Sequence, residues 1–131
     1  MYEIKVKSSF SAAHNLRNYR GKCENLHGHN WNIEAIFAYK SLSKAGMAVD
    51  FKEAKNLLES VLEKFDHSYL NDIGVFKRLN PTSENMARLI YDGIKKSNRC
   101  IASVSVWENE NSCATYRASL RGRSPKQSKN I

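Results

Sequence analysis

The sequence predicts an α+β domain in which a four-stranded antiparallel sheet carries two helices on one face. Three observations support this fold class: polar and apolar residues alternate near both ends of the chain, the middle has apolar residues at helical spacing, and short polar segments separate these stretches. The order places both helices between the second and third strands. Strands are expected over residues 2–7, with a phase that continues to residue 14, and over residues 27–39, 101–107 and 112–120. Helices are expected over residues 51–65 and 81–98.

The strands follow from alternation with a period of two. Residues 2–7 alternate apolar and charged side chains, and the same phase continues to His14. The stretch 27–39 alternates in the same way, but its far end is apolar on both faces. This pattern predicts that other parts of the protein pack on both faces of the strand, and a second subunit is one candidate for such packing. Polar residues 108–111 join the last two strands as a hairpin.

Both helices have recognisable starts. Asp50 precedes the first helix and is suited to cap it, with Glu53 three residues further on as in a capping box. Residues 80–85 combine a proline, two hydroxyl side chains and an acid, which is typical of a helix N-terminus. The apolar stripes of the two helices then predict that both pack on the same face of the sheet.

The composition indicates one globular domain without a membrane segment. The 131 residues suffice for a core of their own, and no apolar run approaches the roughly 20 residues that span a bilayer. The N-terminal stretch lacks the apolar core of a signal peptide. Three widely spaced cysteines do not form a disulfide framework. We therefore expect a cytoplasmic protein with no membrane partner.

The net charge of +8 is concentrated near the C-terminus, because residues 117–131 hold five basic residues and no acidic one. We expect residues 1–120 to form a single domain and residues 121–131 a basic, disordered tail. A solubilising role for the tail and contact with a phosphate-bearing ligand or RNA are the two interpretations.

The histidines suggest a metal site. The chain has four, and His27 and His29 share one face of the second strand, in line with His14 at the end of the first. Three imidazoles with an open position are the catalytic arrangement for zinc. Cys23 lies in the loop before His27, and as a fourth ligand it would instead give a closed structural site.

Two further positions carry ionisable groups with two interpretations each. Asp66 and His67 follow the first helix, either as a helix end favoured by the dipole or as an acid–base pair. Glu108 shares the phase of apolar residues in the third strand. It is either solvated beyond the strand end or accepts hydrogen bonds from a ligand with adjacent N–H donors.

Together these stretches resemble the family of 6-pyruvoyltetrahydropterin synthase and 6-carboxytetrahydropterin synthase (QueD-type). The matching motifs occur in the family's order and span residues 1–120. They are Phe10-Ser11-Ala12-Ala13-His14, Cys23-x-x-x-His27-Gly28-His29, Asp66-His67-x-x-Leu70-Asn71, Pro81-Thr82-Ser83-Glu84-Asn85 and Trp107-Glu108. The resemblance implies the tunnelling fold (T-fold), whose subunits join their sheets into a barrel, commonly as a homohexamer with active sites between subunits.

The resemblance also implies roles for single residues. His14, His27 and His29 would be the zinc ligands, one ion per subunit, and Cys23 the catalytic base. The resemblance implies a pterin substrate that carries a triphosphate, with magnesium as its companion ion. Lys22, Arg17 and Arg20 of the first loop are candidate partners for the phosphates.

By the same resemblance, Asp66 and His67 complete the proton-transfer set and Glu108 anchors the pterin ring. Thr82 and Ser83 match positions that line the pterin pocket from a neighbouring subunit. The implied reaction converts 7,8-dihydroneopterin triphosphate to 6-carboxy-5,6,7,8-tetrahydropterin, with release of acetaldehyde and triphosphate, on the route to queuosine.

Three alternatives remain at the sequence level. The biopterin branch of the family eliminates triphosphate from the same substrate to give 6-pyruvoyltetrahydropterin, and the short chain and compact first loop favour the 6-carboxy branch. A folate branch replaces the cysteine with glutamate, and here Glu24 adjoins Cys23. The most distant alternative is a non-catalytic, basic RNA- or phosphate-binding module with a structural zinc. We expect no nucleic-acid partner, because the strands lack the interleaved basic and aromatic pattern of an RNA-binding sheet.

Overall fold

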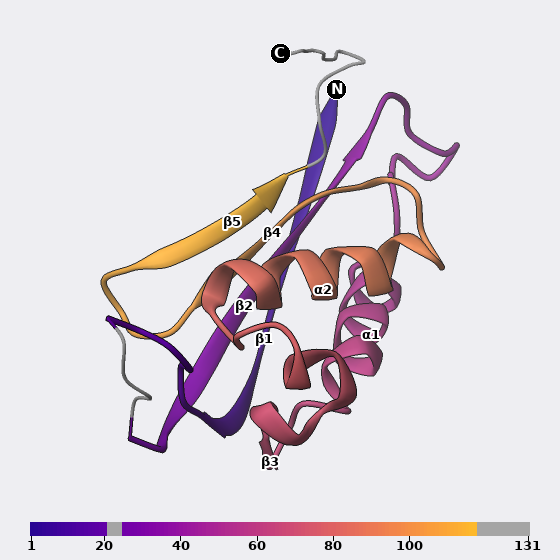
Figure 1. Ribbon diagram of the computed structural model, residues 1–131. Helices are drawn as coiled ribbons and strands as arrows, with labels where there is room; N and C mark the ends of the chain where they lie inside the picture. Colours follow the sequence, from indigo (N-terminus) through magenta and orange to yellow (C-terminus); the bar gives the residue numbers. More distant parts are fainter. Residues whose placement is uncertain (21–24, 118–131) are drawn as a thin grey trace.

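The computed structural model describes residues 1–20 and 25–117, which form one twisted sheet with two helices on one face (Figure 1). The strand order is β3-β1-β2-β4-β5. The strands are β1 (Tyr2–His14), β2 (His27–Tyr39), β3 (Ser68–Tyr69), β4 (Ile101–Trp107) and β5 (Cys113–Arg117), the helices are α1 (Phe51–Leu62) and α2 (Ser83–Lys95), and the 3₁₀ turns are η1 (Leu70–Asp72) and η2 (Gly74–Lys77).

The centre of the sheet is a long antiparallel ladder between β1 and β2. It pairs Tyr2 with Tyr39 at one end and His14 with His27 at the other, without interruption. β4 pairs with β2, and β5 with β4, both antiparallel. The predicted α+β class and the arrangement of two helices between the second and third main strands are confirmed.

The sheet has one strand more than predicted. β3 comprises two residues that lie parallel to Ala12 and Ala13 of β1. A pairing of two residues is too short to show the period-two pattern from which strands are predicted. The four predicted strands correspond to β1, β2, β4 and β5, and residues 118–120 of the predicted last strand lie outside the described residues.

The helix starts follow the predicted capping. Asp50 Oδ1 accepts a hydrogen bond of 2.8 Å from the backbone N–H of Lys52, and Thr82 Oγ1 accepts one of 3.1 Å from that of Asn85. The first helix ends three residues earlier than predicted, at Leu62. Phe65 is fully buried in the following turn, because its ring packs against Phe10 and Phe76 rather than continuing the helical stripe.

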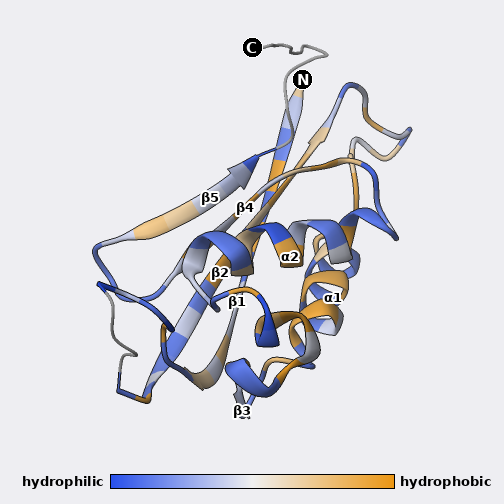
Figure 2. Ribbon diagram, in the orientation of Figure 1, coloured by the Kyte–Doolittle hydropathy of each residue, from blue (hydrophilic) through white to orange (hydrophobic). Residues whose placement is uncertain are grey.

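The core lies between the sheet and the helices. Figure 2 shows that both helices are hydrophobic on part of their surface and hydrophilic on the rest. Trp31, Phe37 and Leu58 are among the side chains with no exposed surface, and complete burial of such a side chain stabilises the fold by roughly 1.5–3 kcal/mol.

The opposite face of the sheet is polar. Glu34 forms an ion pair of 3.6 Å with Lys5 and accepts a hydrogen bond of 3.1 Å from Trp107 Nε1. Within the part of the chain that the structure describes, β5 has a strand neighbour on one side only, and residues 2–11 of β1 likewise pair only with β2. Two sheet edges are therefore open.

Candidate metal centre

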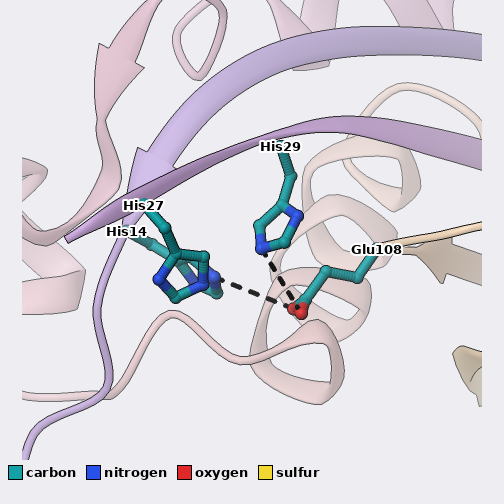
Figure 3. Close-up of side chains that lie close together, drawn as sticks. All are labelled: His14, His27, His29 and Glu108. Atoms are coloured by element: carbon teal, nitrogen blue, oxygen red, sulfur yellow. Dashed lines mark ion pairs between the residues drawn. The ribbon is translucent and has the colours of Figure 1, made fainter. Parts of the chain in front are cut away.

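Three histidines meet at one end of the β1–β2 ladder. His14 ends β1, His27 begins β2, and the two are directly opposite each other. His29 is two residues further along β2 and therefore on the same face as His27. This is the face that carries the core, so the three rings point toward the helix side of the sheet, where Glu108 joins them from the end of β4 (Figure 3).

The four side chains are close enough to share one ion. Each offers one ligand atom, and these atoms lie within 4.8 Å of one another. Glu108 Oε1 lies 3.5 Å from His29 Nε2, and its Oε2 lies 3.8 Å from His14 Nε2. Bonds of about 2.0–2.1 Å to a tetrahedral zinc ion place neighbouring ligand atoms about 3.3 Å apart, so small rotations of the side chains suffice.

Backbone carbonyls select the ring nitrogen that faces the centre. His14 Nδ1 lies 2.8 Å from the carbonyl oxygen of Pro81, and His27 Nδ1 lies 2.8 Å from that of Asn25. Because a carbonyl oxygen only accepts, the proton of each neutral ring is on Nδ1. The lone pair of each ring is then on Nε2, where a metal ion would bind.

The surroundings of His14 fit a bound cation. Its side chain is 2% exposed, and its Nε2 has no hydrogen-bond partner within the described part of the chain. A buried polar atom of this kind normally costs free energy, and a metal ion would satisfy it. The indole of Trp31 packs edge-on against the ring, with centroids 4.9 Å apart, and restricts its orientation. The donor set of three imidazoles and one carboxylate suits zinc and other divalent transition metals.

Two asparagines that sequence reasoning did not identify hold the segment after His14. Asn71 Oδ1 accepts from the backbone N–H of Asn15 at 3.0 Å, and its Nδ2 donates to the Asn15 carbonyl at 2.9 Å. Asn80 makes the same pair of bonds, 2.9 Å each, with the backbone of Arg17. Each side-chain amide thus bonds to both the N–H and the C=O of one residue, as a neighbouring strand would. No periodic signal marks their role, although Asn71 is the last residue of one sequence motif and Asn80 directly precedes another.

Arg17 uses one nitrogen of its guanidinium for structural contacts. Its Nη2 donates to the carbonyl oxygens of Phe76 and, at 2.8 Å, Leu79. Together with Asn80 it fixes the loop that presents the Pro81 carbonyl to His14. As a partner for phosphates, the role expected from the sequence, Arg17 would keep these bonds only if other N–H groups of its guanidinium reached the ligand.

Asp66 and His67 form a contact with each other but lie outside the histidine cluster. His67 Nδ1 is 3.1 Å from Asp66 Oδ1, and 83% of its side chain is exposed. The backbone of Ser11 bonds to both residues: its N–H donates to Asp66 Oδ1 at 3.0 Å, and its carbonyl accepts from His67 N–H at 2.6 Å. The Ser11 N–H and, more weakly, His67 lower the pKa of Asp66, although partial desolvation acts against them.

The remaining predicted site residues have different positions. Thr82 and Ser83 lie at the start of α2, where the Thr82 hydroxyl is the helix cap, and both are half-buried. Cys23 lies in the stretch 21–24, which is outside the described residues. Glu108, expected at the pterin ring, lies 32% exposed in contact with two histidine rings.

The fold and the site define a class of α+β proteins in which a histidine cluster able to hold a metal ion lies at one end of an antiparallel sheet. The family model described as 6-pyruvoyl tetrahydropterin synthase matches residues 3–119, and the chain belongs to this family of enzymes. The resemblance stated from the sequence motifs is thereby confirmed.

Relatives from several organisms agree. The chain is 36% identical to a putative 6-carboxy-5,6,7,8-tetrahydropterin synthase of Archaeoglobus fulgidus, over 87% of this chain and 94% of that protein. It is also 36% identical to the 6-carboxy-5,6,7,8-tetrahydropterin synthase of Synechocystis, over 88% and 93%. The solved structure of Caenorhabditis elegans 6-pyruvoyl tetrahydropterin synthase superposes with a TM-score of 0.80 at 30% identity, covering 90% of this chain and 96% of that one. This superposition supports the expected T-fold.

In the described residues, no helix is both long and apolar enough to cross a lipid bilayer.

Proposed function

We propose that this protein is a zinc-dependent 6-carboxy-5,6,7,8-tetrahydropterin synthase. It would convert 7,8-dihydroneopterin triphosphate to 6-carboxy-5,6,7,8-tetrahydropterin, with release of acetaldehyde and triphosphate, for the synthesis of queuosine. The observation that carries the proposal is the convergence of His14, His27 and His29 in a member of this family, with Nδ1 of two rings engaged by backbone carbonyls. The names of two relatives that match most of the chain favour this product.

The proposal assigns a role to each site residue. The three histidines would hold zinc, which when bound supplies a Lewis acid for the hydroxyls of the substrate side chain. Cys23 would remove a carbon-bound proton, since a thiolate is a suitable base and Cys23 adjoins Lys22 and precedes two histidines in the sequence. Magnesium would accompany the triphosphate, outside the protein's own ligand set.

Asp66 would orient His67 as a second proton-transfer group, and the contact of 3.1 Å between them suits this task. Because 83% of the His67 side chain is exposed and it lies outside the histidine cluster, it would act where another subunit approaches. Glu108 would anchor the pterin ring through its adjacent N–H groups. Thr82 and Ser83 would line the ring pocket from a neighbouring subunit.

The open edges of the sheet support an oligomer. Strand edges with free backbone N–H and C=O groups pair readily with another chain, and both β5 and most of β1 have such edges among the described residues. We propose that neighbouring copies join β5 to β1 and that the assembly is a homohexamer. The proposal further comprises a single catalytic domain over residues 1–120, a basic tail over residues 121–131 and a cytoplasmic location.

The product assay tests the function. Zinc-loaded protein is incubated with 7,8-dihydroneopterin triphosphate, and the pterins are identified by mass spectrometry. We expect 6-carboxy-5,6,7,8-tetrahydropterin together with acetaldehyde; 6-pyruvoyltetrahydropterin alone would establish the alternative branch, and absence of turnover would refute both. A Cys23→Ala variant should retain zinc and lose turnover, whereas loss of zinc would make the thiol a ligand.

The nucleic-acid alternative is tested separately. A non-catalytic RNA-binding module would bind RNA with a steep dependence on salt, and deletion of residues 121–131 would abolish this binding. We expect neither result.

A further inference from the structure

We propose that Glu108 is a displaceable fourth ligand of the metal ion, and that the substrate takes its place on the ion when it binds. In the substrate-free protein its carboxylate would close the coordination shell that the three histidines begin. On arrival of the substrate, hydroxyls of the substrate side chain would take that position, and the released carboxylate would accept hydrogen bonds from the pterin ring. This inference rests on the metal site and the substrate class proposed above.

The first support is the face of the sheet to which the Glu108 side chain points. The preceding residue, Trp107, lies on the polar face of the sheet, where its indole N–H donates to Glu34 at 3.1 Å. Alternation along β4 then places Glu108 on the opposite face, with the histidines. The carboxylate reaches the centre because of the strand register and needs no special loop conformation.

The second support is the distance to the rings. Its oxygens lie 3.5 Å from His29 Nε2 and 3.8 Å from His14 Nε2, close to the separation of about 3.3 Å between ligand atoms on a tetrahedral zinc ion. A carboxylate that served only the pterin ring need not face two imidazoles, one of which, His14, directs its Nε2 lone pair to the metal position. Figure 3 shows both oxygens of Glu108 turned toward these rings.

The third support is that nothing else in the described part of the chain holds this carboxylate. Its polar contacts there are with the two histidine rings, and its side chain is 32% exposed. His14, by contrast, is 2% exposed and fixed by the Pro81 carbonyl. The cluster therefore combines a rigid imidazole with a carboxylate that has room to rotate, as an exchange of ligands requires.

The exchange would couple the two ends of the substrate. A carboxylate on the metal is neutralised and unavailable, whereas a free carboxylate is a strong acceptor for two adjacent N–H donors. The metal ion would accept the side-chain hydroxyls only as Glu108 leaves, and Glu108 leaves most readily when the pterin ring is present to receive it. A molecule with both a pterin ring and side-chain hydroxyls would thus bind in preference to a molecule that has only one of them.

The test compares Glu108→Gln with Glu110→Gln, a matched control in the same hairpin whose carboxylate is not among the four residues of the cluster. Zinc affinity is measured by competition with a chromophoric chelator, and coordination by the visible absorption of the cobalt(II)-substituted protein. We expect Glu108→Gln to bind zinc at least about tenfold more weakly than wild type, within the range of 10–100-fold known for groups that tune a metal site, and to change the cobalt spectrum. Glu110→Gln should change neither.

A second measurement needs no variant. A dihydropterin ring without side-chain hydroxyls is added to wild-type cobalt protein, and the spectrum should move toward that of Glu108→Gln, because the ring draws the carboxylate away. Unchanged zinc affinity and an unchanged cobalt spectrum in Glu108→Gln would overturn the proposal while leaving the three-histidine site intact. If wild-type protein itself fails to bind one equivalent of zinc, the proposed function fails instead.

Discussion

Replacement of Asn80 by alanine tests whether the asparagine bonds that surround the metal centre hold it in place. The substitution removes two hydrogen bonds of 2.9 Å to the backbone of Arg17. Each contributes about 1 kcal/mol net, and leaving part-buried backbone groups without partners costs about 1–3 kcal/mol. The losses of the two bonds add, whereas water satisfies part of the freed Arg17 backbone groups. We therefore expect the free energy of unfolding to fall by about 2–4 kcal/mol.

The assay is urea denaturation of the metal-free protein, followed by zinc titration of the folded variant. The zinc dissociation constant should rise as well, because Asn80 adjoins Pro81, whose carbonyl holds His14. Asn56→Ala is the control: this residue is exposed on α1, and such substitutions change stability by no more than about 0.5 kcal/mol. A loss from Asn80→Ala no larger than that of the control would refute the reasoning.

Three further predictions follow from the same geometry. Zinc at 100 times its dissociation constant should stabilise wild type by about 2.7 kcal/mol, and His14→Ala should lose this increment in thermal unfolding while His67→Ala keeps it; equal behaviour of the two variants would contradict the assigned ligand set. Asn71→Ala should destabilise the metal-free protein by an amount similar to Asn80→Ala, because it breaks an equivalent pair of bonds to Asn15, and a neutral effect would argue against the clamp. The Ser11 N–H, and then His67, lower the pKa of Asp66 below its ordinary value of 3.8, so its carboxylate stabilises the fold at neutral pH and this contribution disappears as the pH falls below about 4. The urea midpoint of Asp66→Asn should therefore decrease less than that of wild type between neutral and acidic pH, and parallel decreases would rule out this source of acid sensitivity.

The sequence predicted the parts of the fold that depend on periodicity. The period of two in residues 2–14 and 27–39 extends over whole strands, and burial of one face made it visible. The short strand β3 was missed because two residues carry no period. The predicted first helix ran past Leu62, where α1 ends, because the apolar Phe65 has the spacing expected of another helical turn.

The histidine cluster was foreseeable for the same reason, whereas its supporting bonds were not. Phase alone assigns His14, His27 and His29 to one face. Asn71 and Asn80, however, act through amide groups on backbone segments 56 and 63 positions away. An asparagine in a polar loop has many equivalent uses, and only the tertiary structure selects one.

The register of β1 and β2 links the stability of the fold to the chemistry of the site. His14 lies opposite His27 only because the ladder that begins at Tyr2 and Tyr39 stays in step for 13 residues. A slip of one residue would turn His14 to the polar face and bury Ala13 in its place, and it would also turn Phe10 and Val6 out of the core. The hydrophobic core therefore enforces the register that brings the imidazoles together.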